Sequence, residues 1–250
     1  MDAEQIQIYL GDALAVMDEL IMKGIKVDAV ICDPPFGTTN SKWDTIIPFD
    51  EMWIKLYALR QSATTPIILF GQEPFSSKLR MSNEKHYKYD WVWDKIKSTG
   101  FLNAKKQPLR GHEFIHVFYE KQCYYNPQKT KGHLLKKSKR KDTSQTSCYK
   151  EMKGNDYASE ERYPRSILKF STDMQKSAIH PNQKPVALLE YFLKTYTKEG
   201  DVVLDFAAGS MSLGEACLNT NRKCILIENN KEFFNDGRNR IFKILERNGE

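Results

Sequence analysis

Apolar and polar positions follow two alternating patterns along most of this chain. Short runs of Val, Ile, Leu and Phe bounded by turn-forming residues predict buried strands, and stretches with an apolar residue every three or four positions predict helices. The predicted strands are residues 6–10, 27–32, 66–70, 87–93, 113–119, 202–204 and 224–227, and the predicted helices are residues 12–22, 50–59, 73–81, 185–196, 213–218 and 231–245. This alternation predicts an α/β fold with a mostly parallel sheet.

The periodicity weakens between residues 120 and 179, where polar side chains dominate. We interpret residues 120–179 as an insertion, and residues 1–119 and 180–250 as the two halves of one domain. A chain of 250 residues is long enough for one such domain with a full core. At the helix starts, Asp50 is expected to be an N-cap, and Pro185 is expected in a first turn.

An unusual turn follows the second predicted strand. It reads Asp33-Pro34-Pro35-Phe36, and its two prolines fix φ and stiffen the backbone. Open α/β sheets bind ligands at the carboxyl ends of their strands. A carboxylate, a carbonyl and an aromatic ring held there suit a planar amine such as the exocyclic group of a nucleobase. The plainer alternative is a surface turn in which Asp33 caps a helix.

A second strand, near the end of the chain, also finishes in an acid. Residues 200–210 run from an apolar strand through Asp205 into a loop of small residues. A helix and another strand follow, and Glu228 ends that strand. An acid about 20 residues after the first strand is the arrangement that holds a ribose in dinucleotide folds.

Together these residues resemble the β class of amino-group DNA methyltransferases, which use S-adenosylmethionine to methylate adenine N6 or cytosine N4. The resemblance implies a Rossmann-like methyltransferase fold with permuted motif order, because the Asp-Pro-Pro-Phe motif precedes the loop after Asp205. It implies that residues 1–119 form the catalytic half, residues 120–179 the target-recognition insertion and residues 180–250 the cofactor-binding half. It assigns catalysis to Asp33, Pro34, Pro35 and Phe36. It assigns cofactor binding to Asp12, His180, Gln183, Lys184, Asp205, Phe206, Ala207, Gly209, Ser210 and Glu228. Lys184 is expected near the cofactor carboxylate.

The loop after Asp205 departs from the family pattern Asp-Pro-Phe-x-Gly-Ser-Gly. Phe206 replaces the proline, Ala207 the aromatic residue and Met211 the second glycine. Glycine permits close backbone approach to a ligand, so Met211 is expected to weaken cofactor binding. The departure also leaves open a catalytically weak DNA-binding partner subunit.

The expected reaction follows from the chemistry of the amine. The lone pair of an adenine amine is delocalised into the ring, so the nitrogen is a poor nucleophile. If Asp33 and the Pro34 carbonyl accept both N–H protons, the nitrogen can turn its lone pair toward a methyl donor, and catalysis is mostly positioning and electrostatics. The base must first leave the duplex stack and is expected to stack on Phe36. The resemblance favours adenine, and N4-cytosine or RNA remain alternatives.

Positive charge is concentrated in the predicted insertion. The chain carries a formal charge of +6, while residues 129–153 contain nine Lys or Arg and two acids, a net charge of +7. Such a segment suits contact with DNA phosphates; a merely solvated loop is the alternative. The residues expected to bind DNA are Lys136, Lys137, Lys139, Arg140 and Lys141. The expected partner is double-stranded DNA, bound by a monomer or a homodimer.

Further sequence patterns bear on the cellular compartment, on membrane insertion and on metal binding. Five cysteines without regular spacing predict reduced thiols in a cytoplasmic protein. No apolar run is long enough for a membrane span, and no signal segment is evident. His112-Glu113-Phe114-Ile115-His116 matches a zinc-protease pattern, but the segment is predicted to be a strand. Two histidines four residues apart in a strand are about 13 Å apart, too far to share one zinc, so no metal site is expected.

Overall fold

The computed structural model describes residues 5–39, 41, 44–139, 141, 142, 144, 153–172 and 183–249. The chain divides into two compact units. The larger unit comprises Met1–Asn126 and Ser166–Glu250, and the smaller unit is Pro127–Arg165. The smaller unit falls within the insertion predicted for residues 120–179, whose role in target recognition stays a prediction.

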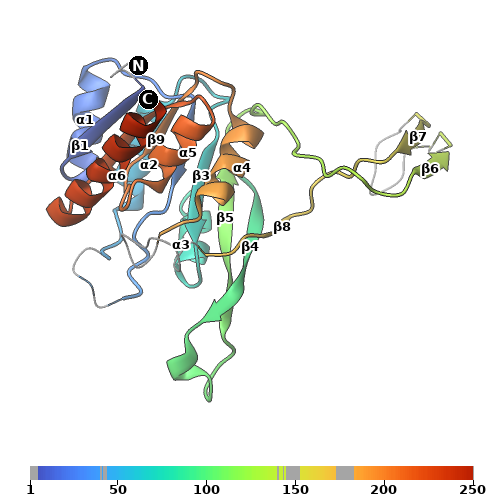
Figure 1. The fold of residues 1–250 in the computed structure, drawn as a ribbon, viewed down its shortest axis with the longest axis horizontal. Coiled ribbons are helices and arrows are strands. Elements are labelled where there is room, and N and C mark those ends of the chain that lie inside the picture. The colour runs from blue at the N-terminus through green and yellow to red at the C-terminus, as the bar shows by residue number, and fades with distance from the viewer. Residues whose placement is uncertain are drawn as a thin grey trace. The chain divides into compact units, whose positions relative to one another are not determined.

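The larger unit is built on one eight-stranded sheet (Figure 1), in the order β1-β10-β9-β2-β3-β5-β4-β8. The strands are β1 (Ile6–Leu10), β2 (Ala29–Cys32), β3 (Ile67–Gly71), β4 (Tyr87–Thr99), β5 (Arg110–Phe118), β8 (Ile167–Lys169), β9 (Val202–Asp205) and β10 (Lys223–Glu228). Every neighbouring pair is parallel except the two pairs that involve β5. The predicted mostly parallel α/β fold is therefore confirmed.

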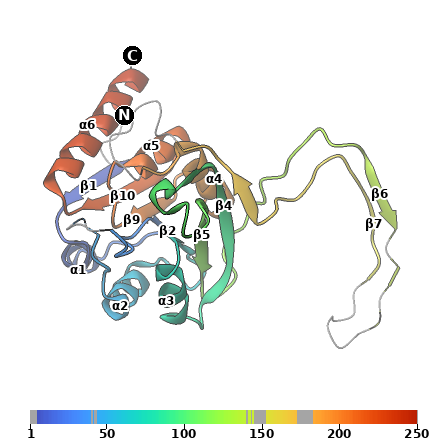
Figure 2. The same ribbon diagram turned by 90° about the horizontal axis from the view of Figure 1, so that it is seen from below.

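Helices cover both faces of this sheet (Figure 2): α1, α2 and α3 on one face, and α4, α5 and α6 on the other. Their bounds are α1 (Ala13–Met22), α2 (Phe49–Leu59), α3 (Phe75–Met81), α4 (Val186–Tyr196), α5 (Ser212–Asn219) and α6 (Lys231–Gly249), with a short 3-10 turn, η1, at Phe101–Asn103. None of the described helices is long and apolar enough to span a membrane.

Two predicted helix starts are wrong. Asp50 lies inside the first turn of α2, which begins at Phe49 after Pro48, and no side chain caps it. Its negative charge in the first turn still stabilises the helix by interacting with the helix dipole. Pro185 is the N-cap of α4 rather than a first-turn residue. In both cases a proline with extended ψ precedes the helix and fixes where it can begin.

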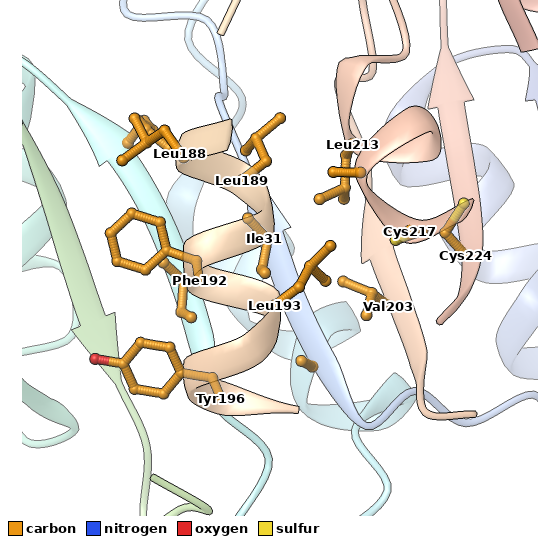
Figure 3. Packing of buried hydrophobic residues seen from close by; sticks show 14 of the residues in the cluster. Ile31, Leu188, Leu189, Phe192, Leu193, Tyr196, Val203, Leu213, Cys217 and Cys224 are labelled. Carbon is orange, nitrogen blue, oxygen red and sulfur yellow. The ribbon is translucent and has the colours of Figure 1, made fainter. Parts of the chain in front are cut away.

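Helix α4 shows how the apolar pattern becomes a core. Leu188, Leu189, Phe192, Leu193 and Tyr196 form one stripe on α4 and are all buried. Figure 3 shows this stripe turned toward the strands. Each such side chain contributes roughly 1.5–3 kcal/mol when fully buried. The stripe thereby holds the start of α4, next to Lys184, against the sheet.

The smaller unit contains a two-stranded antiparallel ribbon, β6 (Lys136–Lys139) and β7 (Asp156–Ser159). All four residues of β6 are exposed, three of them lysines. Lys129 pairs with Glu161 at 3.2 Å and lies over the Tyr163 ring. Most of the positive charge of the described part of this unit is therefore free to meet a ligand.

Candidate active site

Four acidic residues lie where neighbouring parallel strands end. Asp33 follows β2, Asp205 ends β9, Glu228 ends β10, and Asp12 follows β1 after one glycine. The chain leaves β2 for α2 on one face of the sheet and leaves β9 for α5 on the other, although the two strands are neighbours. This reversal is a topological switch point, where open α/β sheets bind ligands.

A cavity of about 950 Å³ opens at this edge, and all four acids line it. Its walls also include the whole Asp-Pro-Pro-Phe motif and the loop after Asp205. The other predicted cofactor residues on its surface are Gln183, Lys184, Phe206, Ala207, Gly209 and Ser210. Ligand pockets commonly have volumes of about 300–1,000 Å³, so this cavity lies at the upper end of that range.

Asp33 lies in the wall of this cavity with one oxygen paired and one unpaired. Its Oδ2 accepts a hydrogen bond from the Lys184 ammonium. Its Oδ1 is buried and has no hydrogen-bond partner among the described residues. Burial raises the pKa of Asp33 to about 6, against the opposing pull of Lys184. The carboxylate is therefore ionised above neutral pH and retains a free acceptor atom.

Lys184 belongs to a line of alternating buried charges. Its Nζ lies 3.3 Å from Glu113 Oε2 on β5, and Glu113 Oε1 lies 2.5 Å from Lys95 Nζ on β4. Burial raises the pKa of Glu113, but Lys184 and Lys95 outweigh it and hold that pKa below its usual value. Burial likewise lowers the pKa of Lys184, and the Asp33 and Glu113 carboxylates reverse that effect and raise it. Glu113 and Lys184 therefore both stay charged, and this line of alternating charges fixes the Asp33 side chain.

Glu228 and Asp205 organise the loop that follows β9. Glu228 accepts hydrogen bonds from the backbone N–H of Gly209 at 2.7 Å and of Asn230 at 2.8 Å. Asp205 accepts one from Ala207 N–H at 3.1 Å. Burial raises the pKa of both acids, that of Asp205 to about 7. Because a carboxylate has about four acceptor sites, both acids can still bind a donor in the cavity.

Asp44 holds the loop that follows the Asp-Pro-Pro-Phe motif. Its two oxygens accept backbone N–H groups from Gly37, Thr38 and Thr39 at 2.6–2.8 Å. The Phe36 ring packs against Phe75 with centroids 5.0 Å apart. The aromatic ring beside Asp33 is thus fixed from the core and from the loop.

A sequence profile of the N6/N4 DNA methylases matches residues 27–239, most of the chain. The chain belongs to the N6/N4 DNA methylase family. This DNA methylase is therefore an S-adenosylmethionine-dependent DNA methyltransferase.

Two similar sequences agree with membership of this family. DNA adenine methyltransferase YhdJ of Escherichia coli K12 is 33% identical to this methylase over 263 residues, covering 94% of this chain and 82% of that protein. Type II methyltransferase M.HpaI of Haemophilus parainfluenzae is 25% identical over 227 residues, covering 86% of this chain and 68% of that protein.

Solved structures give the same fold. M1.HpyAVI in complex with S-adenosylmethionine superposes with a TM-score of 0.65 at 26% identity, covering 94% of this chain and 99% of that one. The cytosine-N4-specific PvuII DNA methyltransferase superposes with a TM-score of 0.61 at 16% identity, covering 98% of this chain and 94% of that one. The latter likeness shows the fold alone.

The cavity of the methylase fits S-adenosylmethionine. That cofactor carries a sulfonium, an ammonium and several hydrogen-bond donors, and the cavity is lined by six acidic residues, the four at the strand ends together with Asp44 and Glu113. Three buried acceptor atoms of its wall have no hydrogen-bond partner among the described residues: Asp33 Oδ1, Gln183 Oε1 and Glu113 Oε2, the last of which is ion-paired with Lys184. A positively charged ligand rich in donors would satisfy such a surface.

The structure places several predicted cofactor residues in structural roles as well. Asp12 Oδ1 accepts N–H groups of Leu14 and Ala15 and so caps α1. Ser210 shares a hydrogen bond with Ser212 at 3.0 Å. Phe206 is buried in the core beneath α1 and α2, although it also borders the cavity. His180 and Arg140 lie outside the described residues.

Met211 does not line the cavity. The weaker cofactor binding expected from its replacement of a glycine stays a prediction. Its φ of 56° is the left-handed conformation that glycine adopts readily. Its side chain is 0% exposed and packs directly against Gly237 of α6. A Cβ at position 237 would lie 2.6 Å from the Met211 Cγ, so only glycine leaves room for this side chain. The methylase therefore keeps the glycine-like backbone, and a small residue on α6 makes room for the Met211 side chain.

Sequence reasoning missed Glu113, Lys95 and Asp44 as site residues. Glu113 was interpreted as part of a strand that happened to match a zinc pattern. The strand is confirmed, because His112 to His116 lie in β5, and among the described residues no cluster of ligands could hold a metal. The available signal was an acid in a largely apolar strand, because a buried acid requires a partner.

Replacing Asp205 by Asn should stabilise the cofactor-free methylase at pH 8. The folded pKa of Asp205, about 7, exceeds its ordinary value of 3.8. A raised acid pKa stabilises the fold fully only at low pH, and that stability is lost as pH rises toward 7. We expect the variant to raise the melting temperature at pH 8, by roughly 2–4 °C for each kcal/mol of stability gained, with a smaller gain at pH 5. Calorimetry at both pH values checks this, and a lower melting temperature at pH 8 would show that the charged form is well accommodated.

Proposed function

We propose that this DNA methyltransferase transfers a methyl group to N6 of an adenine that has left the stack of duplex DNA. The observation that carries the proposal is the free, buried acceptor atom of Asp33 in the wall of the cavity. An exocyclic amine has two N–H protons, and Asp33 Oδ1 with the adjacent Pro34 carbonyl offers two acceptors for them. Family membership limits the target to an amino group of adenine or cytosine.

The residues of the chain have separate tasks in this reaction. Asp33 and the Pro34 carbonyl orient the amine and draw its protons, which concentrates the lone pair on nitrogen. With a pKa near 6, Asp33 can hold the proton that the nitrogen loses. Lys184 and Glu113 keep the Asp33 side chain in place. Phe36, fixed by Phe75, provides a flat apolar surface for the base.

The cofactor would lie between the acids of the strand ends. S-adenosylmethionine supplies an electrophilic methyl group when bound. Glu228 and Asp12 would accept hydroxyl or amine donors, and Asp205 would face a positive group. Gln183 Oε1 is a further free acceptor. Lys184 is the cation expected near the cofactor carboxylate, and it lies in the same wall as Asp33.

Adenine is favoured over cytosine by two observations. YhdJ, at 33% identity over most of both chains, is named a DNA adenine methyltransferase. The motif begins with Asp33, and the family resemblance associates an acid there with adenine enzymes. An inactive partner subunit has lost its main support, because the Met211 side chain points into the core and not into the cavity.

Nucleoside mass spectrometry tests the target atom. Purified protein, S-adenosylmethionine and unmethylated genomic DNA should yield N6-methyladenine after digestion of the DNA to nucleosides. Total RNA incubated in parallel should remain unmodified. N4-methylcytosine as the sole product, or methylation of RNA alone, would reject the adenine assignment while keeping methyl transfer.

The lysines of β6 and the residues next to it should contact DNA phosphates. Each lost phosphate contact removes about 0.9 from the slope of log affinity against log salt. We therefore expect a flatter salt dependence and weaker binding to all duplex sequences when five residues are replaced by Gln: Lys136, Lys137, Lys139, Arg140 and Lys141. Fluorescence anisotropy at several salt concentrations measures this.

The matched control replaces exposed lysines of the larger unit by Gln: Lys23, Lys26, Lys78, Lys85 and Lys243. It lowers the net charge equally and should leave the slope closer to the wild-type value. Equal slopes for the two variants would mean that the segment contributes only general positive charge.

A further inference from the structure

Strands β4 and β5 continue as a hairpin beyond the sheet of the larger unit. Figure 1 shows their paired ends running past the sheet to a short turn. We call residues 96–110 the arm. Every residue of the arm is exposed. It contains four cations, Lys97, Lys105, Lys106 and Arg110, and no acidic residue.

The tip of the arm presents two large apolar side chains to solvent. Phe101 is 81% exposed and Leu102 is 99% exposed. The backbone beneath them is ordered by hydrogen bonds from Asn103 N–H to Gly100 O at 3.0 Å and from Lys106 N–H to Asn103 O at 2.8 Å. Single exposed apolar residues are common, but two adjacent ones on an ordered basic hairpin indicate a contact surface.

The base of the arm forms part of the rim of the active-site cavity. Lys97, Thr99 and Arg110 line that cavity. Arg110 donates a hydrogen bond to Gln72 Oε1 at 3.0 Å, and Gln72 donates one to Thr38 Oγ1 at 3.1 Å, in the loop after Phe36. The arm is therefore attached to the same loop that holds the proposed base-binding ring.

Backbone strain marks the point where the arm leaves the sheet. Ile96 has a φ of 63°, a conformation that is a genuine outlier for a β-branched residue. The pairing register of β4 and β5 is interrupted between Asp94 and Thr99. Strained residues of this kind cluster at functional sites, and this one turns the arm out of the regular sheet.

We propose that the arm binds the DNA duplex around the target base, with its cations on phosphates and Phe101 and Leu102 inserted against the base stack. Extruding a base leaves a gap in the stack, and inserted apolar side chains commonly occupy such unstacked steps. The inference rests on the proposed function, because only a base-extruding enzyme creates this gap at the cavity. DNA also matches the charge of the arm, whereas a second copy of the arm would bring like charges together.

Fluorescence of a tryptophan placed at the tip tests the insertion without requiring turnover. The variant Phe101→Trp should bind a 30-base-pair duplex, and the added emission should be quenched by base stacking as the duplex saturates the protein. Met22→Trp is the matched control, because Met22 is 80% exposed at the end of α1, outside the cavity wall. Its added emission should not change. Emission at position 101 that stays constant at saturation would overturn the proposal.

The second measurement is affinity for the same duplex by anisotropy. The double variant Phe101→Ala/Leu102→Ala should bind about tenfold or more weakly, the effect of losing one base–aromatic stack. The control Met22→Ala/Ile54→Ala removes two other exposed apolar side chains, 80% and 69% exposed, and should bind like wild type. Unchanged affinity of the tip variant, or a change only in oligomeric mass by sedimentation, would assign the tip to another role. A protein that quenches at position 101 but transfers no methyl group would refute the proposed function and leave the arm as a DNA contact.

Discussion

Replacing Asp33 by Ala is expected to lower the rate of methyl transfer by about a thousandfold or more, the range for losing a general base and an oriented acceptor together. The variant removes the one acceptor atom in the cavity wall that is both buried and next to the Pro34 carbonyl. Its fold should persist, because the Lys184 cation that loses Asp33 still has Glu113 as its partner at 3.3 Å. Single-turnover transfer of a radiolabelled methyl group into genomic DNA measures the effect.

Asp50→Ala is the control for the Asp33 variant, since Asp50 is exposed on α2 and does not line the cavity. It should transfer methyl groups at the wild-type rate. The wild-type rate itself should fall as pH drops below about 6, because the Asp33 carboxylate is then protonated and stops accepting. An Asp33→Ala protein that keeps more than a tenth of the wild-type rate would assign the chemistry to another group.

The second large effect concerns Lys184 and stability. Lys184→Met removes a buried cation that contacts both Asp33 and Glu113. Breaking a buried ion pair from one side costs about 3–5 kcal/mol. We expect a loss of this size in the free energy of unfolding at pH 8, measured by urea denaturation. Without the cation the folded pKa of each acid rises, so the lost stability should return as pH falls toward 5.

A double variant separates this charge effect from lost packing. Lys184→Met/Glu113→Gln removes one cation and one of its two acids, so it should recover a substantial part of the stability lost at pH 8. If the single variant is as stable as wild type, or if the double variant is no better than the single one, the line of charges does not hold the site. Neither variant is expected to transfer methyl groups normally, because Asp33 loses its support.

The parts of the fold that are local in sequence could be predicted. The apolar runs at residues 66–70 and 202–204 predict buried strands directly. Asp205 and Glu228 mark the ends of two strands. Their meeting at one edge followed from the rule that parallel strands end together. The exact helix starts did not follow, because Pro48 and Pro185 fix the backbone just ahead of a helix while their side chains give no capping bond.

The charge line could not be predicted because its members are far apart in sequence. Lys184 and Asp33 are 151 positions apart, and only the pairing of β5 between β3 and β4 brings Glu113 to them. The position of the Met211 side chain could not be predicted for a similar reason. Its consequence depends on Gly237 of α6, which gives its side chain a place in the core. The arm was also missed, because exposure of Phe101 and Leu102 is a tertiary property.

The most direct test of the account is modified-base sequencing of DNA from cells that lack their own DNA methylation and express this protein. We predict N6-methyladenine at one recurring short sequence with the wild-type chain, and none with Asp33→Ala at equal protein level. Absence of any modified base with well-folded wild-type protein, or N4-methylcytosine in both samples, would contradict the account.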